Sequence, residues 1–326
     1  MRLALVAPPQ SPCPPQGYGG AERVCDALLR CLMQLGHEVV LFAGPTSTSP
    51  ATELVMSKST NIIAGEQELV ALLEKRKSEF SCIIDFGACH LSSLCLKAPS
   101  VALMGGDTYK KYPHYKIPNR IYVSKQYAQE SGFPYFPYLE NIISADPQND
   151  FPLGDGSGLY ACIYGVVNPQ KGIHIAAASC VLAGIKLKIA GPIQDYNYWN
   201  GWCNFPNVEY VGVITNTKDK IELLTKARVL LFPSVMGEGD PLGPKEALAC
   251  GTPVIAAPRN GISSFLEPYL MGFFGEFPEE IAPLIWKAAS LNRKLVRTIA
   301  LDKLDPMPKA IKLSSLCERV YLGDKW

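Results

Sequence analysis

The chain has 326 residues, of which 48% are hydrophobic and 19% are charged, and its formal net charge is +1. This composition excludes a disordered or fibrous protein, and the length is sufficient for two compact domains. A nearly neutral chain has no overall field to attract nucleic acid. We therefore expect no nucleic-acid partner, and we expect any anionic ligand to be small and bound by local groups.

The first forty residues predict a strand, a helix and a second strand. Arg2 to Ala7 form an apolar run that two prolines end, too short for a signal-peptide core or a membrane span. After a loop rich in Pro and Gly, apolar residues recur at helical spacing from Ala21 to Leu35, and Gly36 is typical of a helix end. With the apolar run His37 to Ala43, these elements predict a βαβ unit.

Strands and helices continue to alternate up to the middle of the chain. We expect a helix over Gln67 to Lys77 and strands over Cys82 to Phe86, Ser100 to Met104 and Arg120 to Val123. Repeated strands separated by helices predict a parallel sheet covered on both faces. Residues 134–158 are rich in turn formers and have no sustained period, so we place the domain linker there.

The second half of the chain repeats this alternation. Its expected strands are Leu159 to Tyr164, Leu187 to Ala190, Val208 to Val211, Val229 to Phe232 and Val254 to Ala257, and its expected helices are Gly172 to Leu182, Lys218 to Ala227 and Pro244 to Cys250. We predict two Rossmann-like doubly wound α/β domains, residues 1–148 and 149–307, facing a central cleft. A closing helix over Pro308 to Leu322 is expected in residues 308–326.

The chain contains eleven cysteines and no recognisable export signal. We therefore expect a reducing compartment, and a cytoplasmic protein, in which thiols are small core residues. Cys89, His90 and Cys95 are close in sequence, but no second pair at ligand spacing accompanies them. The sequence thus predicts no metal site.

The most informative stretch is residues 232–258, FPSVMGEGDPLGPKEALACGTPVIAAP. Its glycines let the backbone approach a ligand at the carboxyl edge of the sheet, and Pro244 suits the first helical position. The amides of that helix start can bind a diphosphate. The carboxylates of Glu238 and Glu246 can accept hydrogen bonds from sugar or ribose hydroxyls. The alternative is that Glu246 is an acid favoured near a helix start and that Glu238 is a solvated loop residue.

This stretch resembles the E-x7-E region of the retaining family 4 glycosyltransferases, which have the two-domain GT-B fold. The resemblance implies that Glu238 contacts the hydroxyls of the donor sugar and Glu246 the ribose. It also places near the sugar and phosphate the backbone of Asp240, Pro241, Leu242 and Gly243. The family commonly has Glu-Gly-Phe-Gly where this chain has Glu-Gly-Asp-Pro, which implies a differently shaped sugar pocket.

A second segment, residues 163–178, IYGVVNPQKGIHIAAA, resembles the family's loop in which a Lys followed by Gly contacts the donor phosphates. That lysine is Lys171. A fixed cation there stabilises the charge that builds on the departing diphosphate. The family usually has an Arg after the first glycine of this loop, where this chain has Val166. Lys171 and the helix amides must therefore stabilise more of the charge on the diphosphate.

A third segment, residues 14–24, PPQGYGGAERV, is similar to the family's Gly-Gly loop. The similarity implies that Gly19 and Gly20 face the donor phosphate and the acceptor, because a backbone without side chains can lie against a ligand. A tight turn before a helix is the alternative.

His90, with Asp85 nearby, follows a strand after which the family often has a sugar-contacting His, and a non-catalytic loop His is its alternative. Residues 109–116, YKKYPHYK, mix basic and aromatic residues as single-strand nucleic-acid binders do, but in a neutral chain we expect a solvated loop or a lip on the acceptor side.

Taken together, the resemblance implies a metal-independent, retaining hexosyl- or pentosyltransferase of carbohydrate biosynthesis, with Glu238 and Lys171 as catalytic residues. Its donor is a nucleotide-diphosphate sugar, its acceptor a glycan or small molecule bound by residues 1–148, and it needs no cofactor. One alternative is a catalytically silent nucleotide-sugar-binding protein, which Val166 favours. The other is an epimerase or phosphorylase of the same fold. No transmembrane segment is expected, and peripheral membrane contact stays open.

Overall fold

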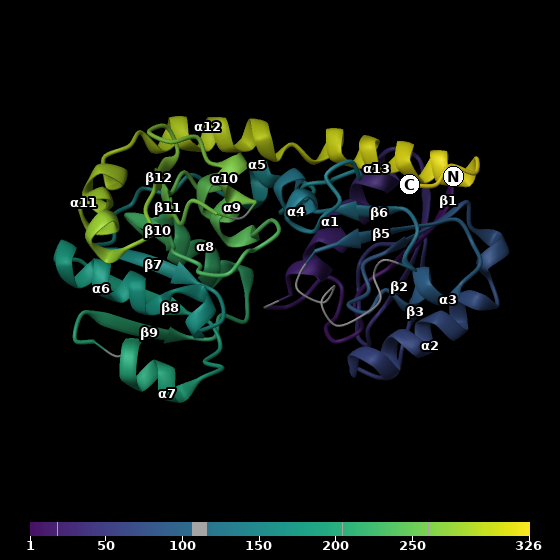
Figure 1. Ribbon diagram of the computed structural model, residues 1–326, viewed down its shortest axis with the longest axis horizontal. Coiled ribbons are helices and arrows are strands. Elements are labelled where there is room, and N and C mark those ends of the chain that lie inside the picture. Colours follow the sequence, from purple (N-terminus) through teal and green to yellow (C-terminus); the bar gives the residue numbers. More distant parts are fainter. Residues whose placement is uncertain (18, 106–115, 204, 260) are drawn as a thin grey trace. The chain divides into compact units, whose positions relative to one another are not determined.

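The computed structural model describes residues 1–17, 19–105, 116–203, 205–259 and 261–326; Figure 1 labels its elements. The chain divides into two compact units: unit 1 is Met1–Ala145 with Asp305–Trp326, and unit 2 is Asp146–Leu304. The expected boundaries were after residues 148 and 307, and the two units change over after Ala145 and after Leu304. The segment 109–116 lies, apart from its last residue, outside the described residues.

Unit 1 contains a parallel sheet with the strand order β3-β2-β1-β4-β5-β6. The strands are β1 (Arg2–Val6), β2 (Glu38–Ala43), β3 (Glu53–Met56), β4 (Cys82–Asp85), β5 (Ser100–Met104) and β6 (Arg120–Tyr122). The order reverses between β1 and β4, and ligands of such sheets bind at the carboxyl ends of the strands beside this reversal. β3 was missed from the sequence because it is a short edge strand without a buried apolar run.

The helices of unit 1 pack on both faces of this sheet. They are α1 (Gly20–Gln34), α2 (Ile62–Glu74), α3 (Leu91–Cys95), α4 (Lys125–Glu130) and α13 (Pro306–Tyr321), with the 3₁₀ turn η1 (Lys77–Glu79). Leu69 and Leu73 of α2 join Val6 and Phe42 of the sheet in one buried cluster. The last helix, α13, contacts α1, β4 and β5, and Figure 1 shows it on the side of the sheet opposite α2. The closing helix is thus a structural part of unit 1.

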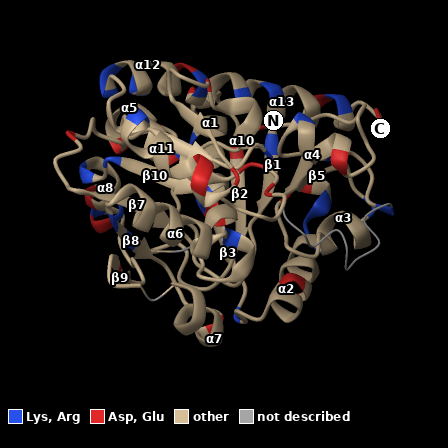
Figure 2. Ribbon diagram, turned by 60° about the vertical axis from the view of Figure 1, so that its left-hand side comes forward, with Lys and Arg blue, Asp and Glu red and all other residues tan. Residues whose placement is uncertain are grey.

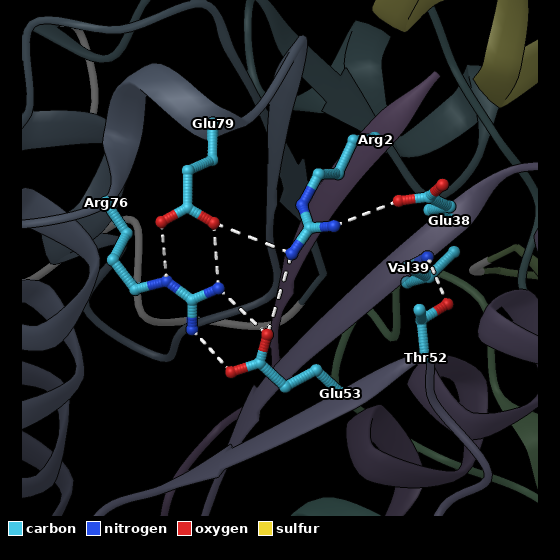
Figure 3. Close-up of polar contacts among 7 residues, drawn as sticks. All are labelled: Arg2, Glu38, Val39, Thr52, Glu53, Arg76 and Glu79. Atoms are coloured by element: carbon cyan, nitrogen blue, oxygen red, sulfur yellow. Dashed lines mark hydrogen bonds and ion pairs between the residues drawn. The ribbon is translucent and has the colours of Figure 1, made fainter.

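The amino ends of β1, β2 and β3 are joined by ion pairs (Figure 3). Arg76 donates to Glu53 at 2.6 and 2.8 Å and to Glu79 at 2.9 and 2.8 Å. Arg2, the first residue of β1, pairs with Glu38, the first residue of β2, at 2.9 Å. The hydrogen bonds from Arg76 hold the pKa of the Glu53 carboxyl below its usual value. Charged groups therefore fasten one edge of the sheet, and the opposite, carboxyl edge carries the loops that can bind ligands.

Unit 2 repeats the topology of unit 1. Its strands are β7 (Tyr160–Tyr164), β8 (Lys186–Ala190), β9 (Val208–Gly212), β10 (Val229–Phe232), β11 (Val254–Ala256) and β12 (Gly272–Phe274). They are parallel, in the order β12-β11-β10-β7-β8-β9, which matches unit 1 when counted from β7. The edge strand β12 was also missed from the sequence, since it is short and begins with glycine. The order reverses between β7 and β10, which are paired.

Helices cover both faces of this second sheet. They are α5 (Pro147–Asp150), α6 (Ile173–Ala183), α7 (Tyr196–Tyr198), α8 (Thr217–Lys226), α9 (Leu242–Ala249), α10 (Ile262–Phe265), α11 (Pro278–Ala289) and α12 (Arg293–Leu304), with the short turns η4 (Pro169–Lys171) and η5 (Trp199–Cys203). Residues of α6 and α11, among them Ala176, Cys180 and Ile285, pack with Ile163 and Leu231 in one core. Two doubly wound α/β units confirm the predicted fold class.

Figure 2 shows Lys and Arg as well as Asp and Glu along the ribbon, and their numbers, 31 and 30, give the net charge of +1. No helix within the described part of the chain is both long and apolar enough to cross a membrane.

Candidate functional site

The loop after β7 carries the predicted phosphate ligand. Asn168 accepts a hydrogen bond from the backbone N–H of Lys171 at 3.1 Å, which closes the short turn η4. Gly172 follows with φ of 67° and is the N-cap of α6. Val166, at the position where an Arg was anticipated from the resemblance, is buried. Its apolar side chain packs inside unit 2, so Lys171 is the cation that this loop presents.

This loop is pressed against the loop that follows β10. The carbonyl oxygen of Gln170 accepts a hydrogen bond from the backbone N–H of Val235 at 2.9 Å. A Cβ on Gly172 would lie 2.0 Å from the carbonyl oxygen of Pro233. Only glycine fits there, because of both the left-handed backbone and the close approach. The two loops therefore form one backbone assembly at the point where the strand order of unit 2 reverses.

Lys171 and Glu238 meet across these two loops. The Lys171 Nζ lies 2.8 Å from Glu238 Oε2, and 21% and 17% of the two side chains are exposed. The carbonyl oxygen of Glu238 accepts a hydrogen bond from the N–H of Gly261 at 3.0 Å. A Cβ on Gly261 would lie 2.1 Å from the carbonyl oxygen of Gly239. The loop that carries Glu238 is thus held by contacts with Gln170 and with Gly261, and the structure brings the two predicted catalytic residues together.

The start of α9 differs from the prediction. The helix begins at Leu242 and not at Pro244, so the proline occupies the third helical position. A proline is tolerated there because the N–H groups of the first turn have no acceptor inside the helix. Pro241 stands at the N-cap and has no side-chain acceptor, so the N–H groups of Leu242 and Gly243 are not capped by it. They are suitable donors to an anion.

Asp240 lies within the donor loop predicted from the sequence, but its side chain turns inward. Its Oδ2 lies 2.6 Å from the Nζ of Lys245, and 2% and 1% of these side chains are exposed. The ammonium of Lys245 also lies 5.0 Å from the ring centroid of Phe265. Asp240 therefore anchors the loop to the first turn of α9, and this pair was not found from the sequence. An ion pair five residues apart leaves no periodic signal.

Glu246 is held by a lysine of α8. Its Oε1 accepts from the Nζ of Lys220 at 2.6 Å, and 3% of each side chain is exposed. Lys220 was missed, although its place three and four residues before the buried Leu223 and Leu224 was a signal for an inward-facing lysine. The structure thus joins Lys171 to Glu238 and, separately, Glu246 to Lys220. The predicted contact of Glu246 with a ribose stays a prediction.

In unit 1 the Gly-Gly loop ends where α1 begins. Gly19 is the N-cap of α1 and Gly20 its first residue. Gly19 has φ of 155°, and a Cβ there would lie 2.6 Å from Pro15 Cβ. Glu22, in the first turn, is buried, and burial raises the pKa of its carboxyl. The geometry accounts for Gly19 as a tight turn before a helix, and its contact with a phosphate stays a prediction.

Two buried carboxylates hold the loop after β4. Asp85 Oδ1 accepts the N–H of Gly87 and its Oδ2 that of Ser93, both at 2.8 Å. Glu66 of α2, which the sequence did not reveal, accepts the N–H of Cys89 at 2.8 Å. Burial raises the pKa of the Glu66 carboxyl, against the opposing effect of that hydrogen bond. Between these anchors, His90 is buried, with its Nδ1 3.6 Å from Asp85 Oδ1.

Within the described ranges, no group of three or more His, Cys, Asp or Glu side chains is arranged to hold a metal ion.

A comparison with protein families decides what unit 2 is. Residues 151–299 match the family model described as "Glycosyl transferases group 1". Residues 151–299 are a group 1 glycosyltransferase domain. This group 1 domain accounts for most of unit 2, and it contains Lys171, Glu238, Asp240 and Glu246. The residues that the sequence singled out for donor binding in the second half of the chain therefore all lie within it.

Solved structures show that the fold around the group 1 domain extends over the whole chain. AviGT4, a glycosyltransferase involved in avilamycin A biosynthesis, is 22% identical, with a TM-score of 0.80 over 100% of this chain and 99% of that one. Sucrose-phosphate synthase from Thermosynechococcus elongatus is 15% identical, with a TM-score of 0.79 over 99% and 100% of the two chains. HepE from Anabaena, solved with UDP-glucose, is 14% identical, with a TM-score of 0.72 over 97% and 98%. These likenesses confirm the GT-B fold. A search of curated protein sequences found no match.

Proposed function

We propose that the chain is a retaining, metal-independent glycosyltransferase of family 4 type, which moves a hexosyl or pentosyl group from a nucleotide-diphosphate sugar to a hydroxyl of a glycan or small molecule. The observation that carries the proposal is the contact of Lys171 with Glu238 at 2.8 Å. It lies beside the reversal of strand order in the group 1 domain, where sheets of this kind bind ligands. The solved complex of HepE with UDP-glucose supports a donor of this class.

The proposed reaction places most of its electrostatic demand on the departing diphosphate. Lys171 and the N–H groups at the start of α9 would stabilise the charge that develops there, so the proposal requires no metal ion. The Glu238 carboxylate would accept hydrogen bonds from the sugar hydroxyls and orient the sugar. The buried pairs of Asp240 and Glu246 would hold the loop and helix in place. We assign acceptor binding to unit 1, and we propose a cytoplasmic role in carbohydrate biosynthesis without a cofactor.

A thermal-shift screen against UDP, GDP, ADP and TDP sugars identifies the donor, because a ligand raises the melting temperature by mass action. With that donor, Lys171→Ala and Glu238→Ala are each expected to lower turnover by about 10²–10³. Matched controls are Lys226→Ala and Glu222→Ala, which break an exposed pair in α8 and are expected to leave turnover unchanged. Unchanged turnover in both site variants, with folding intact, would remove the proposed mechanism.

Three further measurements test the finer parts of the proposal. NMR of the product gives the configuration of the new bond, which is expected to match that of the donor. Turnover is expected to be insensitive to EDTA. A donor hydrolysis assay addresses the alternative of a catalytically silent nucleotide-sugar-binding protein, which the buried Val166 favours. A silent binder would hold the donor without releasing nucleotide.

A further inference from the structure

The ion pair of Lys171 with Glu238 joins the group proposed to bind the diphosphate with the group proposed to bind the sugar. We infer that Glu238 competes with the diphosphate for Lys171, and that the hydroxyls of the donor sugar relieve this competition. The site would then favour the intact nucleotide sugar over the nucleoside diphosphate that remains after transfer. This inference rests on the proposed function, and it concerns the ligand selectivity of the same site.

The first step is that the pair is formed before a ligand arrives. Lys171 and Glu238 come from loops whose backbones are joined by the hydrogen bond between Val235 and Gln170 and by the close contact of Gly172 with Pro233. The positions from which the two side chains extend are therefore fixed. Side chains that start from fixed positions lose less freedom when they pair than two side chains on mobile loops.

The second step is that the pair opposes an anion. A diphosphate that approaches Lys171 meets the Glu238 carboxylate 2.8 Å from the same ammonium. Two anions at one cation repel each other, and less than a quarter of each side chain is exposed to water that would screen the charges. Full engagement of the diphosphate by Lys171 therefore requires Glu238 to give up part of its contact.

The third step is compensation by the sugar. An ionised carboxylate can only accept hydrogen bonds, so Glu238 needs new donors when it loses the lysine. The hydroxyls of a sugar supply them, and a nucleoside diphosphate without its sugar supplies none at this position. Once transfer has removed the sugar, Glu238 can recover Lys171, which weakens the hold on the remaining diphosphate and favours its release.

The test compares binding of UDP, GDP, ADP and TDP with binding of their sugars by isothermal titration. Glu238→Gln removes the charge and keeps one acceptor oxygen. We expect this variant to bind the nucleoside diphosphate about fivefold more tightly than the wild type, the scale of one partly buried ion pair. The affinity for the nucleotide sugar is expected to rise less, so the ratio of the two affinities shrinks.

Two controls isolate the effect. Glu222→Gln makes the same change of net charge in the same unit and frees Lys226 from a 2.6 Å exposed pair, so it is expected to leave diphosphate binding unchanged. In a background of Lys171→Met, the substitution Glu238→Gln is expected to give no tightening, because the contested cation is gone. Tightening in that background would contradict the inference and indicate a general effect of charge.

The outcomes separate this inference from the proposed function. Weaker or equal diphosphate binding by Glu238→Gln, with the wild type still binding and turning over a nucleotide sugar, overturns the inference and leaves the proposed function standing. Failure of the wild type and of Glu238→Gln to bind any of the four diphosphates or their sugars overturns both. Binding that emerges only in Glu238→Gln supports competition at Lys171.

Discussion

The buried pair of Lys245 with Asp240 gives the sharpest test of how the donor loop is held. Lys245→Met keeps a flexible apolar stem of similar length and removes only the ammonium. The carboxylate of Asp240 then stays in the interior and loses the ammonium that lies 2.6 Å from it in the wild type. Because 2% of that side chain is exposed, water cannot replace the lysine.

The size of the effect follows from this burial. Removal of one member of a buried ion pair typically costs about 3–5 kcal/mol, because the other charge stays desolvated. For a unit of roughly this size, each kcal/mol shifts the melting temperature by about 2–4 °C. We therefore expect Lys245→Met to lower the melting temperature of unit 2 by roughly 6–20 °C. Asp240→Leu combined with Lys245→Met removes both charges and is expected to recover most of that loss.

Differential scanning calorimetry measures both variants, and Lys226→Met is the matched control. Lys226 pairs with Glu222 at the same distance of 2.6 Å, but half or more of each side chain is exposed. The control is therefore expected to leave the melting temperature unchanged. Equal effects of Lys245→Met and Lys226→Met, or a double variant no more stable than Lys245→Met, would refute the reasoning that burial gives the pair its importance.

Two further predictions concern the loop contact and the pH dependence. Gly172→Ala is expected to lower both the melting temperature and the nucleotide affinity, because its Cβ would lie 2.0 Å from the carbonyl oxygen of Pro233. The control is Gly184→Ala, since Gly184 has a similar φ of 63° and its Cβ would have no atom within 4 Å. A drop in melting temperature as large in this control would contradict the clash with Pro233. Burial lowers the pKa of His174 from 6.5, so the unfolded chain binds its proton first and stability falls as the pH drops below 6.5. The melting temperature of His174→Gln is expected to fall less between about pH 7.5 and about pH 5.5, and an equal fall would refute this assignment.

The strands that the sequence predicted well are those buried on both faces. The run Val229 to Phe232 was predicted with the bounds that it has in the structure, since a continuous apolar run suits a central strand of a parallel sheet. The strands β3 and β12 were missed because an edge strand is short and partly exposed. The start of α2 was placed at Gln67, five residues after Ile62, because the prediction relied on the apolar period, which becomes clear only there. The helix starts earlier, where Asn61 caps it by accepting the N–H of Ala64.

The site was predicted in part for a related reason. Motifs located Lys171 and Glu238 on loops at one edge of a sheet, and the structure places their charged atoms in contact. The partners Lys220 and Lys245 were missed because both pairs form only when the chain has folded. The helix α8 must pack near α9 before Lys220 reaches Glu246. A single sequence shows which side chains are charged, but not which of them the fold turns inward.

The return of α13 to unit 1 sets the order in which the protein can be completed during synthesis. The segment Asp146–Leu304 is continuous in the chain, whereas the first unit needs Asp305–Trp326 as well. The indole N–H of Trp326, the last residue, donates to the carbonyl oxygen of Arg120 at 2.8 Å. During synthesis, the whole of unit 2 is therefore made before α13, which unit 1 needs to complete its fold. The unit that is begun first is finished last.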